Sequence, residues 1–129
     1  RLAFAAAKYA KLVIASEPVD SLREYMRDEI RKNGITNMRV CDGMCDNLPF
    51  PDNTFDVVMS GHVVGDNFKA EVAELNRIVK PGGWLLDCPG DQPRMTYPSK
   101  ELLAEGWEEL AYIGSFGLQT FRYRKQIHK

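Results

Sequence analysis

The sequence lacks several features that would place its 129 residues in large classes of protein. It has 17 Lys and Arg against 18 Asp and Glu, so it has no excess of positive charge. Nucleic-acid binders and polybasic membrane-surface proteins usually carry such an excess. No apolar run approaches the roughly 18 residues that a membrane-spanning helix needs. We therefore expect neither a nucleic-acid partner nor a membrane partner.

Cysteine is also scarce. The chain has three cysteines, an odd number without paired spacing, which argues against a disulfide framework and favours a reduced, cytoplasmic setting. Cys41 and Cys45 have no second Cys or His pair at the spacing of a zinc site. We therefore predict that the chain holds no metal.

The sequence does contain a regular alternation of helical and short apolar strand patterns, and its length suits a single domain over residues 1–129. Helices are predicted at residues 1–10, 19–30, 68–79 and 99–105, and strands at 12–15, 38–41, 55–60, 84–88 and on both sides of 116–117. We expect Asp66 to cap the third helix and residues 81–83 to form the turn after it. The order predicts an α/β fold with a mainly parallel sheet and a C-terminal antiparallel hairpin.

Ligands of such sheets bind beyond the carboxyl ends of the strands. Here the strand tips carry Ser16-Glu17, residues 42–45, residues 60–62 and residues 88–91. Glu17 is a notable candidate because a carboxylate, which only accepts hydrogen bonds, suits the two hydroxyls of a ribose. The alternative is an ordinary surface carboxylate at a helix start, with Pro18 in the first turn. From the residues alone, both interpretations stay open.

Three segments, taken together, resemble the class I S-adenosylmethionine-dependent methyltransferases, especially their small-molecule branch. They are SEPVDSL at 16–22, GMCDNLPFPDNTFDVV at 43–58 and NRIVKPGG at 76–83, in the family's order. The resemblance covers about residues 1–90. It implies a Rossmann-like fold, S-adenosyl-L-methionine as cofactor and a small-molecule substrate.

The resemblance also assigns roles to single residues. Glu17 would hold the ribose hydroxyls, and Pro18 would pack near the adenine. The loop of Gly43, Met44 and Cys45 would flank the other face of the adenine. The family often has an Asp where this chain has Met44, which removes the usual contact to the adenine amine.

The strand at 55–60 leads to the part of the family's pocket where sulfonium and acceptor meet. Ser60 and Gly61 would line the cofactor there, and a glycine permits close approach of the backbone. His62 is the predicted catalytic residue, a general base for an acceptor that must lose a proton. The alternative is a histidine bonded to a neighbour at the strand end.

One family element is missing from the sequence: a first strand ending in a glycine-rich D-x-G-x-G-x-G loop. We expect an N-terminally truncated domain that binds S-adenosylmethionine weakly or not at all by itself. Alternatives are direct pairing of the flanking strands, or strand exchange within a homo-oligomer. Whether the chain is an active methyltransferase therefore stays open. The other functional hypothesis is a non-catalytic Rossmann-like module that binds a nucleotide or a partner.

Overall fold

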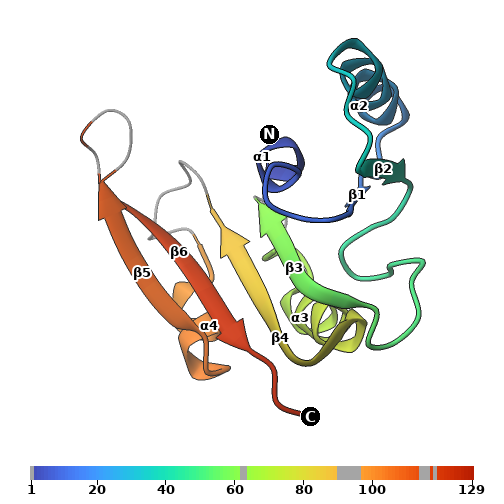
Figure 1. The fold of residues 1–129 in the computed structure, drawn as a ribbon. Coiled ribbons are helices and arrows are strands. Elements are labelled where there is room, and N and C mark those ends of the chain that lie inside the picture. The colour runs from blue at the N-terminus through green and yellow to red at the C-terminus, as the bar shows by residue number, and fades with distance from the viewer. Residues whose placement is uncertain (1, 62–63, 90–96, 114–116, 118) are drawn as a thin grey trace. The chain divides into compact units, whose positions relative to one another are not determined.

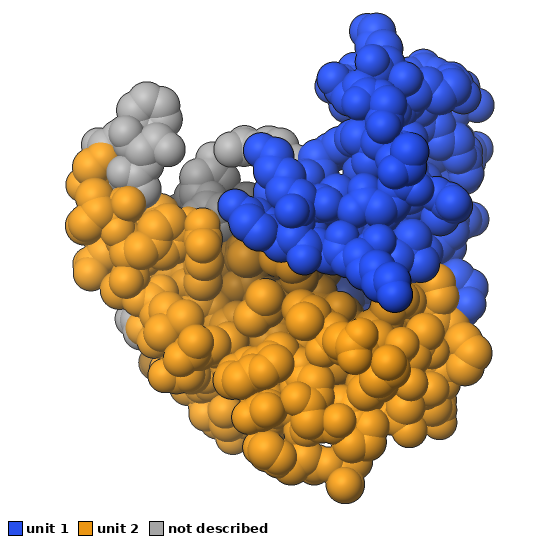
Figure 2. All heavy atoms as spheres, in the orientation of Figure 1, with its two compact units in different colours: residues 1–49 blue, residues 50–129 orange. Residues whose placement is uncertain are grey.

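The computed structural model describes residues 2–61, 64–89, 97–113, 117 and 119–129. The chain divides into two compact units, residues 1–49 and 50–129 (Figure 2). The helices are α1 (Leu2–Ala6), α2 (Asp20–Lys32), α3 (Phe68–Ile78) and α4 (Ser99–Ala104), and the strands are β1 (Val13–Ser16), β2 (Met38–Cys41), β3 (Phe55–Gly61), β4 (Val79–Cys88), β5 (Glu108–Ile113) and β6 (Gln119–Gln126) (Figure 1). The first helix is shorter than predicted, because it ends at Ala6 and passes into a turn.

The first unit is built around the parallel pair of β1 and β2. Their register runs from Val13 opposite Met38 to Ser16 opposite Cys41, so both carboxyl ends lie at one edge. α2 connects the two strands, and Gly34, just after it, has a φ of 62°. Glycine adopts this left-handed conformation without strain, which explains why the helix ends there as predicted.

The second unit contains a four-stranded sheet in the order β3-β4-β6-β5. β3 and β4 are parallel, whereas β6 runs antiparallel to both β4 and β5. α3 and α4 both lie behind this sheet in Figure 1. The parallel pairs and the C-terminal hairpin confirm the predicted α/β architecture.

β4 begins earlier than expected, because the predicted turn at residues 81–83 belongs to its irregular first half. The register between β3 and β4 shifts between Phe55 and Val57, and Gly82 has a φ of 82°. A Cβ at Gly83 would lie 2.7 Å from the main-chain oxygen of Asp56. The glycine pair therefore lets the chain leave α3 and join the sheet without a separate loop.

The core of the second unit lies between the sheet and its two helices. Its buried apolar residues include Leu75 and Ile78 of α3, Leu85 of β4 and Leu102 of α4. Among the described helices, none combines the length and the apolar character that crossing a bilayer requires.

Candidate functional site

The first unit brings the tips of β1 and β2 together, as the parallel pairing predicts. The hydroxyl of Ser16 donates to the main-chain oxygen of Gly43 at 3.0 Å, and the main-chain N–H of Glu17 donates to the oxygen of Cys41 at 3.0 Å. A Cβ at Gly43 would lie only 2.5 Å from the Ser16 oxygen and 2.9 Å from Pro49. Glycine at this position therefore allows the second tip to close against the first.

Glu17, the predicted ribose ligand, is half-buried directly beyond β1. Its Oε1 accepts a hydrogen bond from the main-chain N–H of Val19 at 3.2 Å. Within the described part of the chain, no hydrogen bond to Oε2 is seen. One carboxylate oxygen is thus held in place while the other remains an acceptor, which suits the hydroxyl donors of a ribose diol. Pro18 follows on the exposed side of the tip.

Arg23, which the sequence analysis missed, fastens this tip from α2. Its guanidinium donates to the main-chain oxygen of Glu17 at 2.8 Å and pairs with Asp42 at 3.3 Å, and it also pairs with Asp20. The Arg23 side chain is only 12% exposed, although both of its acidic partners are at the surface. Its place within the SEPVDSLR run, shortly after the acidic tip, is the signal that could have identified it.

The predicted adenine-facing loop forms a tight turn beyond β2. Met44 and Asn47 form an isolated β-bridge, with the Asn47 N–H donating to the Met44 oxygen at 2.9 Å. The Met44 side chain is 58% exposed and Cys45 is half-buried. Met44 therefore presents its polarizable thioether at the surface of the tip and fills no core.

The second unit places Ser60 and Gly61 at the carboxyl end of β3, opposite Asp87 and Cys88 of β4. The Ser60 hydroxyl is buried and donates to Asp87 Oδ1 at 2.6 Å. The Ser60 hydroxyl therefore already donates its hydrogen bond to Asp87. The backbone of Ser60 and Gly61 is the part of this tip that can approach a ligand closely. His62 lies outside the described residues.

Asp87 is the centre of a buried polar cluster that the sequence analysis did not predict. Its side chain is fully buried, and its second oxygen, Oδ2, accepts a hydrogen bond from the hydroxyl of Tyr97. Burial, and then the negative charge of Asp87, hold the pKa of Tyr97 well above its usual range. Tyr97 therefore stays a protonated donor to the carboxylate. A single carboxylate in the otherwise apolar stretch WLLDC was the available signal.

Tyr97 also connects this cluster to the start of α4. Its ring stacks on Tyr123 of β6, with the centroids 6.0 Å apart. The Tyr123 hydroxyl lies 2.6 Å from the Ser99 hydroxyl and 2.7 Å from Oε2 of Glu109. These contacts fix residues 97–99 beside the carboxyl ends of β3 and β4, where a substrate of this type of sheet would bind.

Residues 65–67, directly before α3, are held by Glu71, not by the predicted cap. Asn67 occupies the N-cap position without a side-chain cap bond. The buried carboxylate of Glu71 instead accepts hydrogen bonds from the main-chain N–H of Gly65 at 2.7 Å and of Asn67 at 3.1 Å. The prediction of Asp66 as the cap was wrong, because a carboxylate one turn inside the helix satisfies the main-chain donors first.

Comparison with known proteins gives three concordant results. A family model described as a methyltransferase domain matches residues 1–87. The chain is similar to two proteins named ubiquinone/menaquinone biosynthesis C-methyltransferase UbiE. In Marinomonas sp. the identity is 32% over 104 residues, covering 78% of this chain and 39% of that protein. In Citrobacter koseri it is 31% over 118 residues, covering 84% and 47%.

A solved structure with a similar fold is the SAM dependent methyltransferase from Aquifex aeolicus. It aligns with a TM-score of 0.70 at 20% sequence identity, covering 90% of this chain and 69% of that one. The two matched relatives are considerably longer, and this chain spans less than half the length of each.

Proposed function

The chain belongs to the methyltransferase family, with the Rossmann-like fold of that family, and from this premise we propose that it serves S-adenosylmethionine-dependent methyl transfer to a small-molecule acceptor. The observation that carries the proposal is the joined tip of β1 and β2. There a carboxylate with an accepting oxygen, Glu17, lies beside a glycine loop that is closed down by Ser16 and Arg23.

Different residues would bind different parts of the cofactor. Glu17 would accept hydrogen bonds from the ribose hydroxyls, and Met44 would pack its thioether against the adenine. Because Gly61 has no side chain, the backbone at this position would lie close to the reacting end of the cofactor. When bound, the cofactor supplies a methyl group that its sulfonium already activates, so the protein mainly needs to align the acceptor with it.

A general base is required only if the acceptor loses a proton during the reaction. His62 is our candidate for that base, since it follows Gly61 at the end of β3. The relatives are named as C-methyltransferases of quinone biosynthesis. A small aromatic molecule that accepts the methyl group on carbon is therefore the first acceptor class to test.

We expect Glu17→Ala to weaken the binding of S-adenosylhomocysteine by the full protein about 10- to 100-fold. The change removes hydrogen bonds to a charged acceptor, which are worth about 1.5–3 kcal/mol. Isothermal titration calorimetry measures the effect. The matched control is Glu24→Ala, because Glu24 is an exposed carboxylate on the neighbouring helix α2.

Equal affinities of the wild type and the Glu17→Ala variant would remove Glu17 from this role. Binding of S-adenosylhomocysteine without methyl transfer to any of a panel of small aromatic acceptors would favour the non-catalytic module. Tight binding of NAD in its place would contradict the cofactor assignment.

A further inference from the structure

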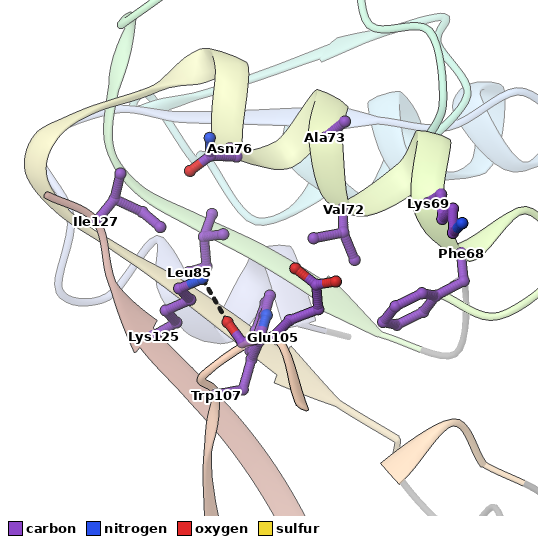
Figure 3. A pocket seen from close by; sticks show the side chains of 10 residues that line it. All are labelled: Phe68, Lys69, Val72, Ala73, Asn76, Leu85, Glu105, Trp107, Lys125 and Ile127. Carbon is purple, nitrogen blue, oxygen red and sulfur yellow. Dashed lines mark hydrogen bonds between the residues drawn. The ribbon is translucent and has the colours of Figure 1, made fainter. Parts of the chain in front are cut away.

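A pocket lies within residues 50–129 and shares no residue with the candidate site. Its volume is about 260 Å³. One wall is a stripe of α3 at helical spacing, formed by Phe68, Val72 and Asn76, and the floor is Leu85 of β4 (Figure 3). Its opposite wall comes from the turn between α4 and β5 and from β6.

Trp107 gives this pocket an unusual polar group. Its side chain is 3% exposed, and its indole nitrogen, Nε1, is buried with no hydrogen-bond partner among the described residues. Buried polar groups nearly always have a partner, because a donor without an acceptor is unfavourable. In Figure 3 the indole extends into the space between Leu85 and Glu105. The position calls for an acceptor that enters from the pocket.

The turn before Trp107 supplies a hydrogen-bond acceptor, the carboxylate of Glu105. Gly106 has a φ of 86°, which lets the chain reverse after α4 and brings Glu105 and Trp107 to the same pocket. The ammonium of Lys125 donates to the main-chain oxygen of Glu105 at 2.5 Å. The Glu105 carboxylate itself points into the pocket, toward Val72 (Figure 3). The pocket thus offers the Trp107 N–H as a donor and the Glu105 carboxylate as an acceptor above an apolar floor, and Lys69, Asn76 and Lys125 add further polar groups to its lining.

We propose that this pocket binds a small uncharged molecule that has an apolar ring or chain and a primary carboxamide. The amide oxygen accepts the hydrogen bond of Trp107 Nε1, the amide N–H group donates to Glu105, and the apolar part packs on Leu85 and Val72. The volume lies just below the roughly 300–1,000 Å³ of sites for drug-sized ligands, so the ligand is small.

The test uses benzamide and the indole N–H signals of the ¹⁵N-labelled protein. The chain has two tryptophans, so Trp84 serves as the internal reference and the Trp84→Phe variant assigns the two signals. Trp84 faces the Arg124 guanidinium, 5.6 Å from its ring centroid, and does not line the pocket. We expect a saturable downfield shift of the Trp107 signal at millimolar benzamide, with the Trp84 signal unchanged.

Two matched comparisons make the test specific. Glu105→Ala is expected to weaken benzamide binding at least about tenfold, whereas Glu101→Ala, which removes another exposed carboxylate of the same helical region, leaves it unchanged. Ala73→Phe, at an exposed position of α3 that lines the pocket, should abolish binding by filling it.

The proposal is overturned if the Trp107 signal does not respond to benzamide, or if both tryptophan signals move together. It is also overturned if Glu105→Ala or Ala73→Phe leaves the affinity for benzamide unchanged. Because this readout involves neither S-adenosylhomocysteine nor methyl transfer, its outcome is independent of the function proposed for the strand tips.

Discussion

The two compact units, residues 1–49 and 50–129, differ in how much apolar side chain they bury. In the described part of the first unit, the buried apolar side chains are Ala15 and Met38, and α2 buries none. Leu22 and Tyr25 of that helix are 48% and 60% exposed. The second unit buries residues from every layer, including Leu85, which is only 1% exposed.

The difference indicates that hydrophobic stabilisation and the fixing of the strand tips at Glu17 and Gly43 come from different kinds of interaction. In the first unit, hydrogen bonds and ion pairs of Ser16 and Arg23 fix the strand ends, with little apolar burial behind them. In the second unit, the Asp87 cluster sits on a packed core. We infer that most of the hydrophobic contribution to stability comes from residues 50–129.

The largest expected effect tests this inference directly. Leu85→Ala should lower the free energy of unfolding by about 2–5 kcal/mol, since it removes buried methyl groups and leaves a cavity. Leu22→Ala, the matched change on the exposed face of α2, should alter it by no more than about 0.5 kcal/mol. Urea unfolding followed by circular dichroism measures both. Equal losses would show that the two units do not differ in this way.

A second test addresses the polar cluster. Asp87→Asn replaces one acceptor oxygen by an NH₂ group that faces a hydroxyl donor, so either Ser60 or Tyr97 loses its acceptor. We expect a loss of about 1–3 kcal/mol in the free energy of unfolding. The control is Asp56→Asn, whose carboxylate is 86% exposed and lies 3.3 Å from Lys80. Exposed pairs contribute about 0–1 kcal/mol, so a comparable loss in both variants would contradict the assigned role of Asp87.

The smallest expected effect is a dependence on alkaline pH. Burial and the charge of Asp87 raise the pKa of Tyr97, so the folded state keeps a proton that the unfolded state loses near pH 10. The stabilisation is complete below pH 10 and decreases above it, by up to about 1.4 kcal/mol per pH unit. Urea unfolding between pH 8 and 11 should show a shallower decline for Tyr97→Phe than for the wild type.

Tyr9→Phe is the control for this pH dependence, because Tyr9 is 91% exposed and belongs to the first unit. Its slope should match that of the wild type. A wild-type slope in Tyr97→Phe would show that Tyr97 does not contribute to the alkaline decline.

Local patterns sufficed to predict most of the architecture. Strands are predicted by the continuous apolar run after Phe55 and by the alternation of Phe121 and Tyr123 with Arg122 and Arg124. The structure has β3 and β6 at these positions. The position of Glu17 beside the end of β2 could be predicted because the two strands pair in parallel, and its role toward a ligand stays a prediction. The family resemblance then supplied the cofactor.

The Asp87 cluster could not be predicted in the same way. Ser60, Asp87 and Tyr97 come from three separate segments, and only the register of β3 against β4 brings the first two together. No local periodicity encodes such a contact between distant segments. The cap at Glu71 was missed for a related reason: two adjacent polar residues, Asp66 and Asn67, competed for the position, and the tertiary position of the loop decided the outcome.

The place of β6 in the middle of its sheet has a consequence for the order of folding. Its pairing with β5 joins residues close in the sequence, from Ile113 opposite Gln119 outward, and a hairpin of this kind forms within microseconds. Its pairing with β4 places Trp84 opposite Gln126, so the whole chain between these two residues forms a loop that must close. Loop-closure entropy must be overcome before that contact becomes favourable. The docking of the hairpin onto β4 should therefore limit the folding rate of residues 50–129, with the Tyr123–Asp87 register set only at that late step.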